Sequence, residues 1–187
     1  MKYTQKSQYQ GGVLVSSFTE RFAKSKKCFF DVVKPCFLQT FGGELLQTEN
    51  IEHEITQALD LRACIDALWC PAYDSNAVYS VAMRIQYGHC YKTFTIREST
   101  TTGVATEYEK TSNAIKSGTM FPCLTIQAYV DNEQIVGAAL AFTKTIYECI
   151  EKGLCTRRMN NYDGNSFIAV HWETIQNNGY EIAFFNH

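Results

Sequence analysis

The chain lacks an excess of charge of either sign. Its 187 residues include 17 Lys and Arg against 19 Asp and Glu, which gives a net charge of −2. Bulk charge therefore excludes a strongly basic nucleic-acid binder, although it leaves room for a local basic face. The sequence also has no uncharged apolar run near the ~20 residues of a membrane span, and MKYTQKSQYQGG contains no apolar signal core. We expect a soluble, cytoplasmic protein.

The common catalytic and metal-binding motifs are also missing. There is no CxxC pair, GxGxxG, P-loop or GxSxG, and His89 beside Cys90 lacks a second ligand pair at zinc-like spacing. The eight cysteines are scattered, and several lie in apolar runs such as ACIDALWC, which is typical of reduced, buried thiols. A Cys–His nucleophile pair stays open as an alternative, with His53, His89 or His171 as the base, but no cysteine is singled out.

Apolar and aromatic residues are abundant. Hydrophobic residues make up 45% of the sequence, with 12 Phe and 11 Tyr, and this composition predicts a compact globular protein. The length indicates a single domain over residues 1–187. Residues 1–17 are polar and contain glycine, so we expect a flexible or loosely packed segment there.

The order of patterned segments predicts an α/β (α+β) fold with a mixed, mostly antiparallel sheet flanked by helices. Helical periodicity runs from Phe18 to Phe37 with an interruption at Pro35, and a short helix is expected in ELLQTENIEHEITQALDL. Thr106 as N-cap and Gly118 near the C-cap bound another helix. The other expected elements are a meander of strands 63–70, 78–87 and 92–98, a hairpin of LTIQAYV and QIVGAALAF turning at Asp131–Asn132, a helix in TKTIYECIEKG ended by Gly153, a polar loop CTRRMNNYDGNS, a strand FIAV, a helical turn HWETIQNN and a last strand YEIAFF.

Polar side chains recur along the three strands of the expected meander. Asp66 lies in ACIDALW, Arg84 and Gln86 lie in VYSVAMRIQY, and Arg97 ends YKTFTIR. Because side chains alternate along a strand, Ala82, Arg84 and Gln86 share one face. Single carboxylates and cations on adjacent strands are how a two-layer α/β nuclease presents its metal and phosphate ligands.

The phrase ALDLRACID, together with the order helix, three-strand meander, helix and strand, resembles the restriction-endonuclease-like, or PD-(D/E)xK, superfamily over about residues 28–130. The resemblance implies a restriction-endonuclease-like core and makes Asp66 the match for the metal-binding Asp. On the next strand Ala82 stands at the position of the acid and Arg84 at that of the Lys. The motif is therefore degenerate, and we expect a protein that is not an efficient enzyme.

An active enzyme of this kind would bind Mg²⁺ through Asp66 and recruit another carboxylate, since Arg84 stays protonated and cannot act as a general base. The candidates are Glu98 and Glu107, with Glu52 and Glu54 upstream. The structural alternative is a salt bridge between Asp66 and Arg84, with Glu107 in a solvated first helical turn.

Nucleic-acid contact is expected at cationic and amide side chains of the meander and at a basic run upstream of it, and it requires no cofactor. The expected contacts are Arg84, Gln86, Arg97, Lys92, Lys26 and Lys27. Solvated surface is the alternative for each cation, and Arg157 and Arg158 in the polar loop have the same two interpretations. Tyr91 near the meander could stack on a base or pack at the rim of the core.

Three classes of function fit these features. The first is a DNA-binding protein of phage or mobile-element type with a nuclease-like, degenerate fold. The second is an active, magnesium-dependent DNA endonuclease with relocated ligands. The third is a counter-defence protein, because the small size and dense aromatics are similar to anti-CRISPR proteins that contact DNA and a CRISPR effector or another defence nuclease. We expect DNA binding through Arg84, Arg97 and nearby cations.

Overall fold

The computed structural model describes residues 9–10, 13–14, 18–48, 54–74, 76–99, 103–159 and 164–185. Its centre is a six-stranded sheet in the order β11-β8-β7-β5-β4-β3. Among these strands β5 and β7 are parallel, and the other neighbours are antiparallel, so the mixed, mostly antiparallel sheet is confirmed. The bounds are β3 (Glu44–Gln47), β4 (Ala67–Cys70), β5 (Tyr79–Tyr87), β7 (Leu124–Asp131), β8 (Gln134–Phe142) and β11 (Ile182–Phe184).

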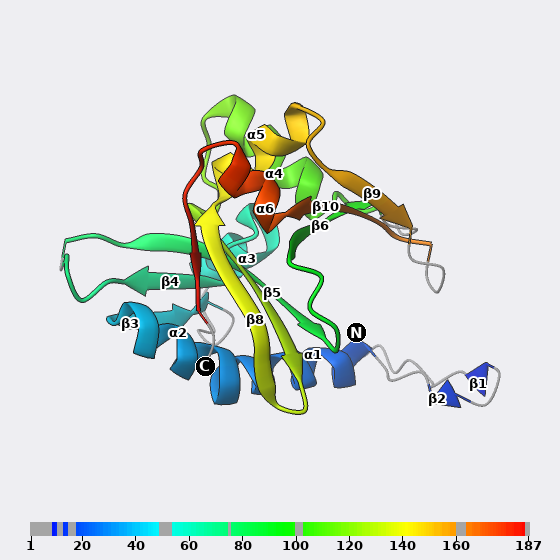
Figure 1. Cartoon of the computed structure of the whole chain (residues 1–187), viewed down its shortest axis with the longest axis horizontal. Coiled ribbons are helices and arrows are strands. Elements are labelled where there is room, and N and C mark those ends of the chain that lie inside the picture. The colour runs from blue at the N-terminus through cyan, green and yellow to red at the C-terminus, as the bar shows by residue number, and fades with distance from the viewer. Residues whose placement is uncertain are drawn as a thin grey trace.

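A long helical run covers one face of this main sheet (Figure 1). It consists of α1 (Phe18–Cys28), a π-helical turn η1 (Phe29–Val33) and α2 (Lys34–Phe41). Pro35 lies at the start of α2, where a missing N–H is tolerated, so the helical run continues through it. Phe37 is fully buried and meets Trp69 and Phe185 edge-on, with ring centroids 5.3 and 5.5 Å apart.

The opposite face of the main sheet carries a second sheet and the remaining helices (Figure 1). The second sheet has the order β6-β10-β9 and is antiparallel throughout. Its strands are β6 (Thr93–Ser99), β10 (Ser166–His171) and β9 (Thr156–Met159), and the helices are α3 (Glu54–Ala63), α4 (Glu107–Ser117), α5 (Thr143–Glu151) and α6 (Trp172–Asn177). Phe94, Ile146 and Ile168 are fully buried in the core between these elements.

Side chains from outside the second sheet accept hydrogen bonds from the N–H groups of its edge strand β6. The N–H of Thr93 donates to the hydroxyl of Tyr129 at 3.3 Å, and the N–H of Thr95 donates to Oε1 of Gln127 at 3.2 Å. The N–H of Arg97 donates to Oε2 of Glu107 at 3.4 Å. Three successive edge donors of β6 therefore have acceptors on β7 and α4, which attaches the second sheet to the main one and leaves these donors unavailable to another strand.

Several expected elements are confirmed. Helix α4 begins with a capping box in which Thr106 and Glu109 exchange hydrogen bonds, and it ends at Gly118 in the left-handed conformation. The hairpin of β7 and β8 turns through Asn132 and Glu133, both with positive φ, one residue beyond the expected turn. The expected helices α5 and α6 and the strands β10 and β11 are also present.

The prediction of a three-strand meander is wrong. β4 and β5 pair as expected, but β6 leaves the main sheet and pairs with β10, while β7 takes the place beside β5. The physical reason is apolar burial, since Phe94 and Ile96 of β6 are almost fully buried against α5 and β10. The strand expected from residue 63 begins at Ala67, because α3 continues to Ala63, and the expected polar loop contains β9.

In the N-terminal segment the structure describes an antiparallel pair of two-residue strands, β1 (Tyr9–Gln10) and β2 (Val13–Leu14). The other residues of 1–17, for which a flexible segment was expected, lie outside the described residues, as does Glu52. No helix within the described ranges is long and apolar enough to span a membrane.

Candidate nucleic-acid interface

A row of three side chains crosses the second sheet on the face turned toward β5. In the register of the strands Phe167 lies directly opposite Arg97 on β6 and Arg158 on β9. Directly opposite residues point to the same side of an antiparallel sheet, so these three form an Arg–Phe–Arg row. Both arginines are exposed and Phe167 is half-buried, so the row places an aromatic face between two guanidinium groups at the surface.

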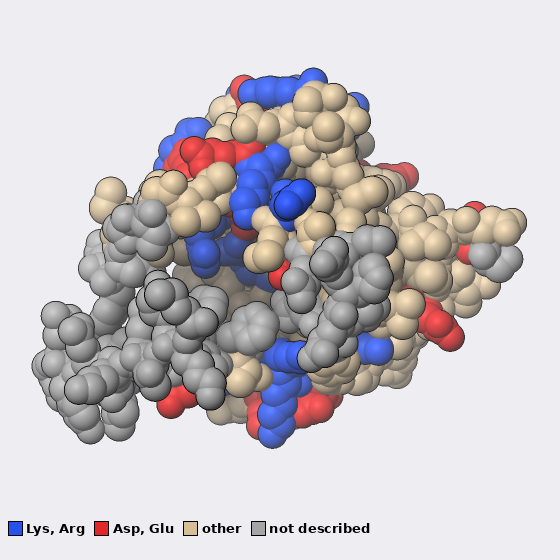
Figure 2. All heavy atoms as spheres, turned by 180° about the vertical axis from the view of Figure 1, so that it is seen from behind, with Lys and Arg blue, Asp and Glu red and all other residues tan. Residues whose placement is uncertain are grey.

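The Arg–Phe–Arg row borders a hollow of about 370 Å³ between the second sheet and the end of β5. This volume is at the lower end of the range for small-ligand sites, about 300–1,000 Å³. The residues that line the hollow are Gln86, Tyr91, Thr93, Thr95, Arg158, Met159, Phe167, Ala169 and His171. Figure 2 shows the molecule from behind, with Lys and Arg side chains gathered in and around a hollow of that side. No Asp or Glu lines the hollow of 370 Å³ within the part of the chain that the structure describes.

Arg84 lies beside Phe167, the middle member of the Arg–Phe–Arg row. Its guanidinium carbon is 6.0 Å from the centroid of the Phe167 ring, within the range of a cation–π contact. The same side chain forms an ion pair with Glu107 of α4, and both side chains are 23% exposed. Arg84 therefore contributes to the basic face, but its charge is compensated inside the chain.

The carboxylates expected for catalysis are used within the protein. Oδ2 of Asp66 accepts the N–H of Met83 at 2.6 Å, which fixes the start of the β4–β5 pair. Glu107 binds Arg84, and Glu98 accepts from Nε of Arg157 at 2.7 Å. Across the described residues no group of three or more His, Cys, Asp or Glu could hold a metal ion. The side chain of Glu54 lies outside the described residues.

Asp66 and Glu107 do act on a common neighbour, the thiol of Cys64. Burial raises the pKa of Cys64 to about 11, and the negative charges of Glu107 and Asp66 add to the shift. Burial also raises the pKa of Tyr147 far above its usual range, with Glu107 again contributing. These two groups are therefore neutral at physiological pH and are not activated as nucleophiles.

The remaining predicted cations are distributed over other parts of the surface. Lys92 is exposed and lines a separate hollow beside Trp172. Lys27 lines a third hollow together with Asp31, Asp131 and Glu133, so it faces carboxylates. Lys26 lies in the last turn of α1, which packs on the opposite face of the main sheet. The structure therefore groups Arg84, Gln86 and Arg97 and does not bring the three lysines to them.

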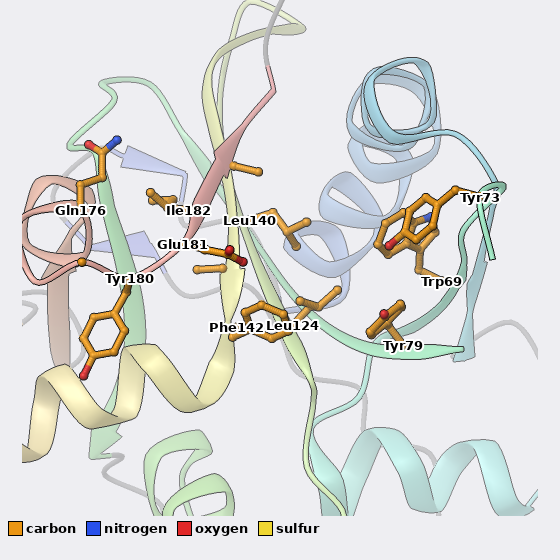
Figure 3. A pocket seen from close by; sticks show the side chains of 13 residues that line it. Trp69, Tyr73, Tyr79, Leu124, Leu140, Phe142, Gln176, Tyr180, Glu181 and Ile182 are labelled. Atoms are coloured by element: carbon orange, nitrogen blue, oxygen red, sulfur yellow. The ribbon is translucent and has the colours of Figure 1, made fainter. Parts of the chain in front are cut away.

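Another hollow, lined by several aromatic side chains, lies elsewhere and has a different character. It measures about 710 Å³, and Figure 3 shows Trp69, Tyr73 and Tyr79 on one side and Tyr180 on the other. Leu124, Leu140 and Phe142 lie between them. Glu181 is the charged residue in its lining, which does not suit a polyanion.

The sequence analysis assigned no role to Phe167, left Arg158 with two interpretations, and considered His171 only as a possible catalytic base. Arg158 was one of two arginines in an expected loop, and Phe167 and His171 were part of a short strand and a helical turn. Period-2 alternation in TRRM and SFIAVH was the available signal, because it puts Arg158 and Arg157 on opposite faces. The position of Arg158 directly opposite Phe167 depends on the β9–β10 pairing, which no local pattern encodes.

Comparison of the chain with protein-family models, with curated proteins and with solved structures gives no match. The resemblance to the PD-(D/E)xK superfamily, the use of magnesium and the counter-defence role are therefore hypotheses that rest on the sequence.

Proposed function

We propose that this protein binds single-stranded DNA across the Arg–Phe–Arg row, without cleaving it. The observation that carries the proposal is the placement of Phe167 between Arg97 and Arg158 on one face of the second sheet, beside a hollow whose described lining contains no carboxylate. Proteins that bind single strands combine cations that follow the phosphates with aromatic rings on which bases stack. The row supplies both groups within one cross-strand line.

We propose single-stranded and not duplex DNA as the ligand because of the shape of the site. The ring of Phe167 and the hollow lie between the second sheet and β5, so a base reaches them only when it is free of its partner strand. A duplex exposes phosphates and groove edges and keeps its base faces stacked. Binding without cleavage is proposed because Asp66, Glu98 and Glu107 all have partners within the chain.

The test is fluorescence anisotropy with labelled single-stranded DNA, duplex DNA and RNA of the same sequence, at several salt concentrations. Arg158→Ala should weaken binding and reduce the slope of log K against log salt by about 0.7, the value for one lost phosphate contact on a single strand. Phe167→Leu keeps an apolar side chain and removes the ring, so we expect a loss of about fivefold or more.

Arg157→Ala is the matched control, because Arg157 is the neighbour of Arg158 in sequence, points to the other face of β9 and is exposed. We expect it to bind almost as the unchanged protein does. Equal losses in the two arginine variants would show general electrostatic attraction and contradict the proposed face. Tighter binding of the duplex would contradict the single-stranded form, and tighter binding of the RNA would reassign the ligand.

A further inference from the structure

The hydrogen bonds beneath the hollow fix the orientation of one side-chain amide. Gln127 of β7 is 1% exposed, and its Oε1 accepts from both the N–H and the hydroxyl of Thr95, at 3.2 and 3.0 Å. A backbone N–H can only donate, so the atom of Gln127 that faces it must be the oxygen. The amide of Gln127 therefore has one possible orientation, in which Nε2 points away from β6.

The fixed amide of Gln127 determines the orientation of Gln86 in turn. Nε2 of Gln127 donates to Oε1 of Gln86 at 3.2 Å, so the oxygen of Gln86 is turned toward β7. Gln86 lines the hollow, and within the described residues Nε2 of Gln86 has no hydrogen-bond acceptor. The group that Gln86 can offer to a ligand in the hollow is therefore an NH₂ donor.

Arg158, a charged residue that lines the hollow, is also a hydrogen-bond donor. The guanidinium of Arg158 only donates hydrogen bonds, and Arg158 lines the same hollow as Gln86, opposite Phe167 in the β9–β10 pair. A ligand that meets both groups must present acceptors. Among the bases of DNA, guanine and thymine place a carbonyl where adenine places an amino donor, and adenine carries no carbonyl at all.

We infer that the hollow selects a nucleobase with a ring carbonyl, such as guanine or thymine, over adenine. The inference rests on the proposed binding of single-stranded DNA and adds the class of base that occupies the site. The base stacks on Phe167, and its carbonyl accepts from Nε2 of Gln86. In the same pose adenine places its amino group against the same donor and leaves both groups without a partner, so it must turn to present a ring nitrogen instead, and this mismatch is how a buried polar site discriminates.

The experiment uses a strand of abasic sugar-phosphate units with one central base, so that a single base is available to the hollow. That base is adenine in one strand and hypoxanthine in the other, and the two differ by an amino group against a carbonyl at C6. We expect the hypoxanthine strand to bind about fivefold tighter, the effect of one hydrogen bond made rather than left unmade. The purely abasic strand gives the contribution of the phosphates.

Two variants test the hydrogen-bond relay itself. Gln86→Met keeps the length of the side chain and removes the donor, so the ratio of the two affinities should fall to about one. Gln127→Glu keeps the acceptor for Thr95 and replaces Nε2 by a second acceptor, so Gln86 should turn its NH₂ to position 127 and its oxygen to the hollow. The preference should then shift toward adenine, and if this buried substitution prevents folding, Gln86→Met decides.

The outcomes separate the inference from the proposed function. Equal binding of the two bases, both tighter than the abasic strand, would overturn the base preference and leave the proposed function in place. Retention of the preference in Gln86→Met would also overturn it. If no strand binds, or if binding is indifferent to Arg158→Ala, the proposed function fails and the base preference fails with it.

Discussion

Arg84 of β5 and Glu107 in the first turn of α4 form an ion pair directly beside the Arg–Phe–Arg row. The same carboxylate oxygen of Glu107 accepts the edge N–H of Arg97. One side chain of α4 thus connects the main sheet to the second sheet. Glu107 also compensates the positive charge of Arg84 beside the proposed interface, so the site is less basic than its arginines imply.

Glu107→Gln should strengthen the binding of single-stranded DNA, because it removes the negative charge that compensates Arg84. The slope of log K against log salt should become steeper by up to about 0.7, since Arg84 can then neutralise one more phosphate. The free energy of unfolding should fall by roughly 1–2 kcal/mol, because the charged hydrogen bonds to Arg84 and to the edge of β6 are weakened. Anisotropy titrations at several salt concentrations and urea denaturation measure the two effects.

Glu151→Gln is the control for this change, since Glu151 is an exposed residue of α5 that makes the same difference in net charge. It should leave the salt slope unchanged and raise the affinity only slightly. If Glu107→Gln shows no greater gain than Glu151→Gln, Arg84 does not face the DNA.

Local sequence patterns predicted most of the individual elements of this fold. The capping box of Thr106, the hairpin of β7 and β8 and the end of α5 near Gly153 all depend on residues close together in the chain. What the patterns did not predict is the choice of partner for β6. Its sequence YKTFTIR fits a strand in either sheet, and only the burial of Phe94 and Ile96 against segments over 50 residues later decides between them.

Local patterns were limited in the same way for the candidate site: they identified residues but not their partners. Arg84, Gln86 and Arg97 were singled out from the sequence because they are polar residues on strands, and the structure brings them to one region. The carboxylates were assigned to a metal because their partners were unknown. In the structure Asp66 accepts from the N–H of Met83, Glu107 pairs with Arg84, and Glu98 pairs with Arg157. None of these contacts follows from spacing along the chain.

Gly137→Ala should destabilise the protein through a single steric contact. A Cβ at this position of β8 would lie 2.6 Å from Sγ of Cys90 and 3.5 Å from Cη2 of Trp172. The first distance is too short for a carbon and a sulfur atom, so Cys90 or the strand must move. We expect a loss of about 1–3 kcal/mol in the free energy of unfolding, measured by urea denaturation.

A double-mutant cycle with Cys90→Ala identifies the cause of that loss. Removal of the sulfur atom makes room for the new methyl group, so the double variant should be more stable than the sum of the single changes implies, by about 0.5–3 kcal/mol. Strict additivity would mean that Cys90 is not the obstacle.

The stability of the protein should fall between pH 9 and pH 11 in a manner that depends on Cys64. The pKa of its thiol is raised from 9.0 to about 11 in the folded state, chiefly by burial and next by the charge of Glu107. Below pH 9 the thiol is neutral in both states, and its contribution to stability is fully present. Between pH 9 and pH 11 the unfolded chain loses this proton and the folded chain keeps it, so stability decreases as pH rises.

The measurement compares urea midpoints of the unchanged protein and Cys64→Ala at pH 8, 9, 10 and 11. Other groups also titrate in this range, but they are common to both proteins, so the difference between the midpoints isolates Cys64. We expect the unchanged protein to lose its advantage progressively from pH 9 to pH 11. Cys123→Ala removes an exposed thiol, so it shows the effect of deleting a cysteine whose thiol is not buried. A difference between the unchanged protein and Cys64→Ala that is constant over the whole range would mean that the Cys64 thiol ionises equally easily in both states, and that neither burial nor Glu107 acts on it.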